Sequence, residues 1–187
     1  RFSAQTFRSK VTFELEQLEG ASQELLRDTL LHALDMYATG PRVIQTQLCL
    51  ALAARALQLS EPRWGNVVPG MLERIGGAPS TVGVLLEFLT VLPEEVSMNH
   101  RIPMDNTTYH DRVSQLLTQH AMSALQVLVM YIQADGVTST IQAMIFACLR
   151  SWLKTGEVTA VQLAETPLLS CTFVALQDEL LFDTAVD

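Results

Sequence analysis

Two apolar stripes run along the segment 81–96 and point in nearly opposite directions. The first stripe consists of Val82, Leu85, Leu86, Leu89 and Leu92, and the second consists of Val84, Phe88 and Val91. Both have the spacing of an α-helix, whereas a surface helix needs only one apolar stripe. The pattern therefore predicts a helix that is covered on two sides. Pro93 lacks a backbone N–H and is followed by two acids, so we expect the helix to end there.

The same periodicity predicts helices along the rest of the chain, and no stretch shows the sustained alternation of a strand. Ser22 is a candidate N-cap, and the polar segment 97–106 is expected to be a loop. The predicted helices cover residues 2–18, 22–38, 41–59, 64–75, 81–96, 107–134, a segment from 137 that is stopped by Thr155-Gly156, and 158–177 with an interruption at Thr166-Pro167. A further element begins at 179.

Thickly apolar helices alternate with helices that have one apolar side. The thickly apolar ones start near residues 2, 41, 81 and 137. The first intervals are close to the roughly 40-residue period of HEAT and armadillo repeats, and the loop and long helix after residue 96 stretch the last one. One helical hairpin cannot bury its inner surface alone, so such hairpins stack into an array. We predict an all-α fold, a right-handed α-α superhelix (HEAT-repeat solenoid) of stacked antiparallel helix pairs; a compact helical bundle is the alternative. The expected repeats are 1–38, 41–76, 79–135 and 137–178, with 179–187 starting another.

Burial follows from this architecture. Side chains of the doubly covered helices should be buried, and apolar side chains near the ends of the chain should be exposed because terminal repeats lack a neighbour. The chain begins at Arg1 and ends within a helical pattern, so we interpret it as a fragment of a larger protein. The residues expected to be buried are Leu48, Leu85, Phe88, Leu89 and Leu92, and those expected to be exposed are Phe2, Phe7, Leu181 and Phe182.

Composition narrows the class of partner. Hydrophobic residues make up 49% of the chain, charged residues 17%, and the formal net charge is −8. An acidic surface disfavours direct binding of nucleic acid and of anionic membranes, and is compatible with a basic protein partner. The longest apolar run, 48–54, is too short to span a bilayer.

The sequence contains no constellation typical of an enzyme, and we expect no catalytic residue, cofactor or metal. The four histidines lack the spacing of a helical zinc site, and no nucleophile elbow or phosphate-binding Gly-rich loop with Lys occurs. Adjacent Glu94 and Glu95 diverge rather than pair, and Trp64 and Trp152 are interpreted as packing residues. The cysteines, Cys49, Cys148 and Cys171, are widely spaced, which is typical of reduced thiols rather than of a disulfide framework.

The one-sided helices should place polar residues side by side along one wall of the array. Solenoids use such walls to bind proteins, although each residue taken singly is equally compatible with a solvated face. The polar residues on these helices are Glu24, Arg27, Asp28, Asp35, Glu73, Arg74, Arg112, Gln115 and Gln119.

Six segments of the chain, in order, resemble the importin-β (karyopherin-β) superfamily of nuclear transport receptors, in its transportin-SR and importin-13 branch. The most specific is Leu92-Pro93-Glu94-Glu95 within its leucine-rich helix. The resemblance implies that the chain holds about HEAT repeats two to five. The segments are 4–7, 26–31, 45–53, 86–96, 148–152 and 179–183.

The resemblance also implies a function. Members of this family shuttle between cytoplasm and nucleus, pass the pore on FG-repeat proteins, and load or release protein cargo when Ran-GTP binds. Cargo of the transportin-SR branch is Arg/Ser-rich or similarly basic. Ran-GTP sits on the second helices of the first repeats, here 22–38 and 64–75, which implicates Arg27, Asp28, Asp35, Glu73 and Arg74. The rival function is a HEAT-repeat scaffold of the phosphatase or vesicle-coat type, without a transport role.

Overall fold

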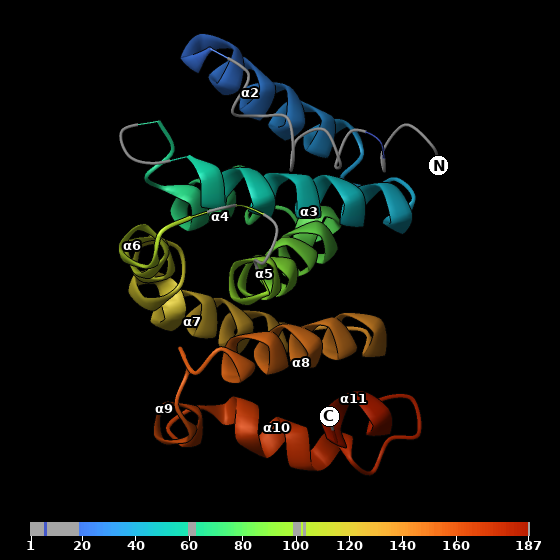
Figure 1. The fold of residues 1–187 in the computed structure, drawn as a ribbon. Helices are drawn as coiled ribbons and strands as arrows, with labels where there is room; N and C mark the ends of the chain where they lie inside the picture. Colours follow the sequence, from blue (N-terminus) through green and yellow to red (C-terminus); the bar gives the residue numbers. More distant parts are fainter. Residues whose placement is uncertain (1–5, 7–18, 60–62, 99–101, 103, 187) are drawn as a thin grey trace.

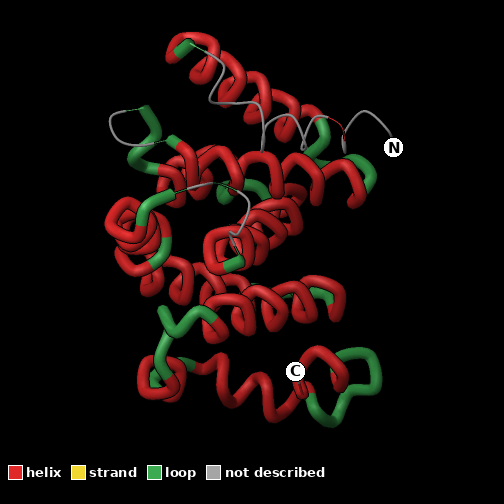
Figure 2. The backbone as a smooth tube through the Cα atoms, viewed as in Figure 1, coloured by secondary structure: helices red, strands yellow, loops and turns green. Residues whose placement is uncertain are grey.

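The computed structural model describes residues 6, 19–59, 63–98, 102 and 104–186, and within them only helices, turns and loops occur (Figures 1 and 2). Apart from Thr6, the helix predicted over 2–18 lies outside the described residues. Two short 3-10 helices, η2 (Pro79–Thr81) and η3 (Thr118–His120), precede α5 and α7. The α-helices are α2 (Gly20–Met36), α3 (Arg42–Gln58), α4 (Val67–Ile75), α5 (Val82–Ser97), α6 (Asn106–Leu116), α7 (Ala121–Ile132), α8 (Ser139–Lys154), α9 (Ala160–Ala164), α10 (Pro167–Ala175) and α11 (Phe182–Val186).

The helices stack from α2 at one end to α10 and α11 at the other (Figure 1). Helix α5 lies between α3 and α8, which packs on its opposite side, while α4 packs on α5, α7 on α8 and α10 on α7. Each helix thus contacts its neighbours along the stack rather than one common centre. The prediction of an all-α HEAT-repeat solenoid is confirmed.

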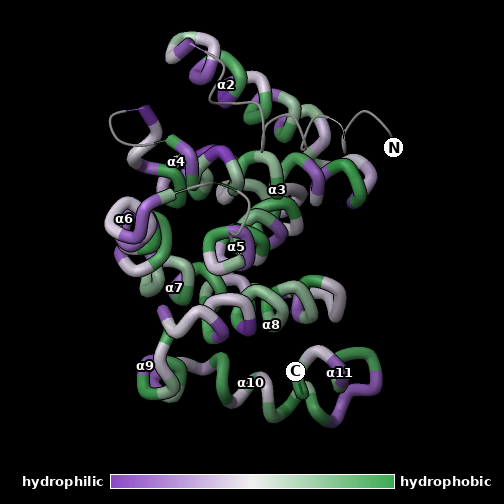
Figure 3. Tube along the Cα trace, in the orientation of Figure 1, coloured by the Kyte–Doolittle hydropathy of each residue, from purple (hydrophilic) through white to green (hydrophobic). Residues whose placement is uncertain are grey.

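Helix α5 is buried on two sides, as its two apolar stripes predict. Phe88 from one stripe and Leu85 and Leu89 from the other are all 0% exposed. Figure 3 shows green, apolar positions along both α3 and α5, interspersed with white and purple ones. Leu48 in α3 is only half-buried, although it packs against the same core.

Pro93 lies inside α5 and does not end it, so the predicted stop is wrong. The helix continues to Ser97. A proline in a helix leaves the carbonyl four residues earlier without its N–H partner. Here that carbonyl belongs to Leu89, and it accepts a hydrogen bond from the indole Nε1 of Trp152 in α8 at 2.9 Å. The helix tolerates Pro93 because its neighbour supplies the missing donor.

The predicted single helix over 107–134 is interrupted. Helix α6 ends at Leu116, Leu117 adopts φ −117° and ψ −64°, and α7 starts at Ala121. The two halves pack on different partners. Helix α6 contacts α3 and is linked to the end of α5 by the Tyr109 hydroxyl, whereas α7 contacts α8 and Tyr131 donates to the Gly76 carbonyl at 3.0 Å. One straight helix cannot serve both sets of contacts.

Several predicted helix boundaries shift by a few residues. Helix α2 begins at Gly20, so Ser22 lies in its first turn and is not the N-cap. Helix α4 begins at Val67 rather than Trp64, which leaves 63–66 as a turn. Pro69 then falls in the first turn of α4, where a missing N–H costs nothing.

The C-terminal end of the stack exposes apolar side chains only in part. Phe182 is 49% exposed, as expected. Leu181 is buried at 3% exposure, contrary to expectation, because α11 folds back onto α8 and α10 and places it in a small cluster with Phe146 and Ala175. Phe2 and Phe7 lie outside the described residues.

Candidate functional site: the groove between α2 and α4

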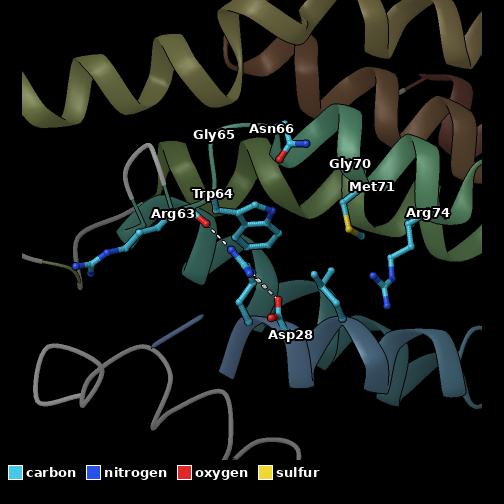
Figure 4. A pocket seen from close by; sticks show the side chains of 10 residues that line it. Asp28, Arg63, Trp64, Gly65, Asn66, Gly70, Met71 and Arg74 are labelled. Atoms are coloured by element: carbon cyan, nitrogen blue, oxygen red, sulfur yellow. Dashed lines mark hydrogen bonds and ion pairs between the residues drawn. The ribbon is translucent and has the colours of Figure 1, made fainter. Parts of the chain in front are cut away.

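A groove of about 390 Å³ separates α2 from α4 and from the turn 63–66 (Figure 4). Its position, between the one-sided helices α2 and α4, is where the sequence places the polar wall. Half of its lining residues have charged or amide side chains, and two of its apolar ones, Trp64 and Met71, are nearly buried. The lining residues are Arg27, Asp28, Leu31, Arg63, Trp64, Gly65, Asn66, Gly70, Met71 and Arg74.

Helix α2 presents its charged side chains because its apolar stripe is turned the other way. Leu30 and Leu34 are buried in the core and hold α2 against α3. The end of α2 is held by Gln45 of α3, whose Nε2 donates to the carbonyls of Tyr37, Ala38 and Gly40. The rotation of α2 about its axis is therefore determined by α3, and Asp28 and Asp35 remain on the other side.

Asp35 and Arg74 form an ion pair that joins α2 to α4. The Arg74 Nε lies 3.0 Å from both carboxylate oxygens of Asp35, and Nη2 bonds Oδ2 as well. The hydrogen bond to Asp35 raises the pKa of Arg74. The two side chains are 36% and 40% exposed, so the pair is open to water and to competition from a partner.

Arg27 links the opposite end of the groove. Its Nη1 donates to the carbonyl oxygen of Arg63, and its Nε donates to Asp28 Oδ1 at 2.8 Å (Figure 4). Asp28 is the more exposed member of this pair, at 59% against 20%. The Trp64 side chain lies beside these groups and is 8% exposed.

The five residues predicted for partner binding thus lie on two neighbouring helices, and the structure brings four of them into ion pairs. Arg27, Asp28 and Arg74 line the groove, and Asp35 joins them through Arg74. Glu73 is exposed on α4 but does not line the groove. Arg112, which the sequence places on the polar wall, is instead buried at 8% exposure, where it donates to Gln115.

Sequence reasoning missed a cluster of arginines behind one end of the groove. Arg55 in α3 is fully buried, and its Nη2 lies 3.4 Å from Gln23 Oε1. Arg63 Nη1 lies 3.1 Å from the same oxygen. Burial, with smaller contributions from the charges of Arg27 and Arg63, lowers the pKa of Arg55 to about 10. The available signal was an arginine that interrupts an otherwise apolar helix, 48–59.

The part of the chain that the structure describes also contains buried thiols and side chains that can bind metals. No three His, Cys, Asp or Glu side chains there are grouped as metal ligands would be. Burial raises the pKa of the Cys148 thiol to about 12 and also raises the pKa of the Cys49 thiol. No helix among these residues is long and apolar enough to cross a membrane.

Known proteins resemble the chain over its whole length. A family model described as "Exportin 1-like protein" matches residues 41–187. The chain is 32% identical over 197 residues to the mRNA transport regulator MTR10 of Saccharomyces cerevisiae, and 29% identical over 198 residues to importin-13 of Homo sapiens. It is also 29% identical over 192 residues to transportin MOS14 of Arabidopsis thaliana. Each alignment covers 100% of this chain and 19% of the relative, so the chain spans about a fifth of the length of these relatives.

Proposed function

Because this chain belongs to the importin-β superfamily, in the branch of the transportins and importin-13, we propose that it is part of a nuclear transport receptor. In this proposal the receptor shuttles between cytoplasm and nucleus and carries protein cargo through the pore under the control of Ran-GTP. The observation that carries the proposal is the alignment of the entire chain with proteins named as importin-13, transportin and mRNA transport regulator. The other partners are FG-repeat proteins of the pore and Arg/Ser-rich or basic cargo, which a chain of net charge −8 would attract.

We place Ran-GTP on α2 and α4, over Arg27, Asp28, Asp35, Glu73 and Arg74. We divide the repeats at 1–38, 41–76, 79–135 and 137–178, so that α2 and α4 fall in consecutive repeats. Arg27, Asp28 and Arg74 line one groove, Asp35 pairs with Arg74 beside it, and Glu73 is exposed on α4 outside it. Charged groups that border a docking surface act mainly on the rate and specificity of association, and like charges placed opposite each other cost several kcal/mol.

Asp28→Lys combined with Glu73→Lys tests this placement in the full-length protein. Both residues are exposed, and neither makes the ion pair that holds α2 to α4. Asp35 is left intact because replacing it would break its contacts with Arg74. We expect the affinity for Ran-GTP to fall by about tenfold or more at fixed salt, while the affinity for Ran-GDP serves as the reference.

Glu165→Lys combined with Glu179→Lys is the matched control. It changes the net charge by the same amount at exposed positions near the other end of the stack. We expect this control to leave Ran-GTP affinity within about twofold of the wild type, as for surface changes remote from an interface. Equal loss in both double variants would remove α2 and α4 from the Ran footprint. Absence of GTP-dependent binding in the wild type would favour a HEAT-repeat scaffold without a transport role.

A further inference from the structure

Helices α2, α4 and α7 are linked in a row by two polar bridges, both formed at the C-terminal ends of the helices. Asp35 in the last turn of α2 accepts hydrogen bonds from Arg74 in the last turn of α4. The Tyr131 hydroxyl in the last turn of α7 donates to the carbonyl of Gly76, the C-cap of α4, at 3.0 Å. Tyr131 is 8% exposed, whereas the Asp35 and Arg74 side chains are 36% and 40% exposed. The bridge between α2 and α4 is therefore the weaker link of the row, because water and salt reach it.

Asp35 occupies a position that α2 by itself disfavours. The C-terminus of a helix carries a partial negative charge, so an acid in the last turn is unfavourable unless a cation neutralises it. The last turn of α2 contains no basic residue. Arg74 supplies the cation from α4, 39 residues away in the sequence, and Figure 4 shows its side chain pointing from α4 towards α2. The charge of Asp35 is thus compensated across the groove and not within its own helix.

The contacts around this bridge divide the four helices α2 to α5 into two units that meet along α3 and α5. Helix α2 packs on α3, and Gln45 of α3 donates to the carbonyls that follow α2. Helix α4 packs on α5, and the hydroxyl of Thr81, just before α5, donates to the carbonyl of Ile75 at the end of α4. Helices α3 and α5 pack on each other through buried apolar side chains, whereas a groove of about 390 Å³ separates α2 from α4. The two units are therefore held by apolar packing on the α3–α5 side, and an exposed ion pair bridges them on the α2–α4 side.

We propose that the Asp35–Arg74 pair is a latch: when it opens, the two units tilt on the α3–α5 contact and the C-terminal ends of α2 and α4 move apart. The opposite end of the groove is closed by the hydrogen bond from Arg27 to the carbonyl of Arg63, and the Arg27 side chain is only 20% exposed. The groove therefore widens most at the latch. Opening also leaves both charges of the latch unpaired, so a partner that binds either of them favours the open form. The latch requires neither Ran-GTP nor a transport role.

The distance between two spin labels in the full-length protein, measured by double electron–electron resonance, tests the proposal. The labels replace His32 on α2 and Glu73 on α4, which are exposed and lie close to the latch in sequence. They are attached through a non-canonical amino acid, so that the native cysteines are left unlabelled. At low salt we expect one main distance and a longer one in about a tenth of the molecules. High salt and Arg74→Ala should each raise the ratio of the longer to the main distance by about two- to fivefold, so that the longer one is found in about a fifth to a third of the molecules.

Arg42→Ala is the matched control. It removes an arginine whose ion pair with Glu87 joins α3 to α5, where apolar packing also holds the units together, so the two distances should remain as in the wild type. A longer fraction that is unchanged both in Arg74→Ala and at high salt would overturn the proposal. An equal shift in Arg42→Ala, or faster amide hydrogen exchange throughout α3 and α5 in Arg74→Ala, would also overturn it, because the protein would then loosen as a whole. The measurement contains no Ran, so its failure leaves the proposed function untouched, and the reverse also holds.

Discussion

The hydrogen bond from Trp152 to the Leu89 carbonyl explains how α5 passes through Pro93, and it can be tested by removing the donor. Trp152→Phe keeps an aromatic ring in a site that is 1% exposed but deletes the indole N–H. The Leu89 carbonyl would then be buried with no donor, because Pro93 has no N–H to offer. The neighbouring Thr90 carbonyl, which accepts from Ser151 Oγ at 2.6 Å, would be unaffected.

Leaving one buried carbonyl without a partner costs about 1–3 kcal/mol, in addition to the packing lost with the smaller ring. Pro93→Ala separates these two costs. An alanine at position 93 restores the backbone N–H, which can donate to the Leu89 carbonyl within the helix. In that background Trp152→Phe should lose only packing. The interaction energy of the two substitutions is therefore expected to be about 1–3 kcal/mol, in the direction of rescue.

The cycle consists of the wild type, the two single variants and the double variant. Urea unfolding followed by far-UV circular dichroism gives the free energy of unfolding of each, and amide hydrogen exchange reports the local stability of α5 and α8. Trp64→Phe provides a matched control. It makes the same chemical change in the turn before α4, where the indole makes no hydrogen bond within the described residues. Its cost should be the same with and without the Pro93→Ala substitution.

Additivity would refute the reasoning. If Trp152→Phe costs the same in both backgrounds to within about 0.5 kcal/mol, the Leu89 carbonyl does not depend on the indole donor. A coupling of similar size between Trp64→Phe and Pro93→Ala would also count against it, because the effect would then not be specific to the α5–α8 contact.

Three further predictions concern stability. Phe88→Ala should lower the free energy of unfolding by about 3–5 kcal/mol because Phe88 is 0% exposed between α3 and α8, whereas Phe173→Ala, at 63% exposure, should change it by about 0.5 kcal/mol at most. Asp35→Arg should destabilise the α2–α4 contact, and adding Arg74→Asp should restore it. A double-mutant cycle in urea should give an interaction energy of roughly 0.2–1 kcal/mol that falls as salt is added. An interaction energy that is undiminished at high salt would contradict the ion pair. Hydrogen bonds from the Thr108 side chain and backbone N–H lower the pKa of Asp105, the N-cap of α6. The stability that this carboxylate gives to the start of α6 is therefore present above the ordinary Asp pKa and is lost as pH falls through the lowered value. Amide exchange of Thr108 across acidic pH should show this loss, and Asp105→Asn should remove the pH dependence.

Much of the fold follows from local pattern alone. Helical periodicity and Gly or Pro punctuation locate the helices, because these signals act within a few residues of each other. Gly136 and Gly156, with φ of 74° and 78°, lie where the predicted helices end. The two stripes of the segment 81–96 also predicted a doubly covered helix, since a helix exposes apolar residues only where a neighbour covers them.

The candidate site was predicted only as a set of residues on two helices. The sequence placed Asp28 and Asp35 on one face of α2, because they are separated by two helical turns. It could not show that Asp35 pairs with Arg74, since the two are 39 residues apart and their contact depends on the distance and rotation between α2 and α4. For the same reason Arg55 was no more than an arginine that ended an apolar run.

The features that only the tertiary structure decided share one physical cause. Pro93 continues a helix because Trp152 of α8 supplies a donor, and α6 ends before Leu117 because α6 and α7 pack on different partners. Local propensity differs by only about 1–3 kcal/mol even for Gly and Pro, which a single buried hydrogen bond or a packed side chain can offset. The sequence by itself therefore determined which segments are helical, which faces are apolar and which superfamily the chain resembles. The packing of α5 against α8, and of α2 against α3 and α4, determined where those helices continue, where they break and which charges meet.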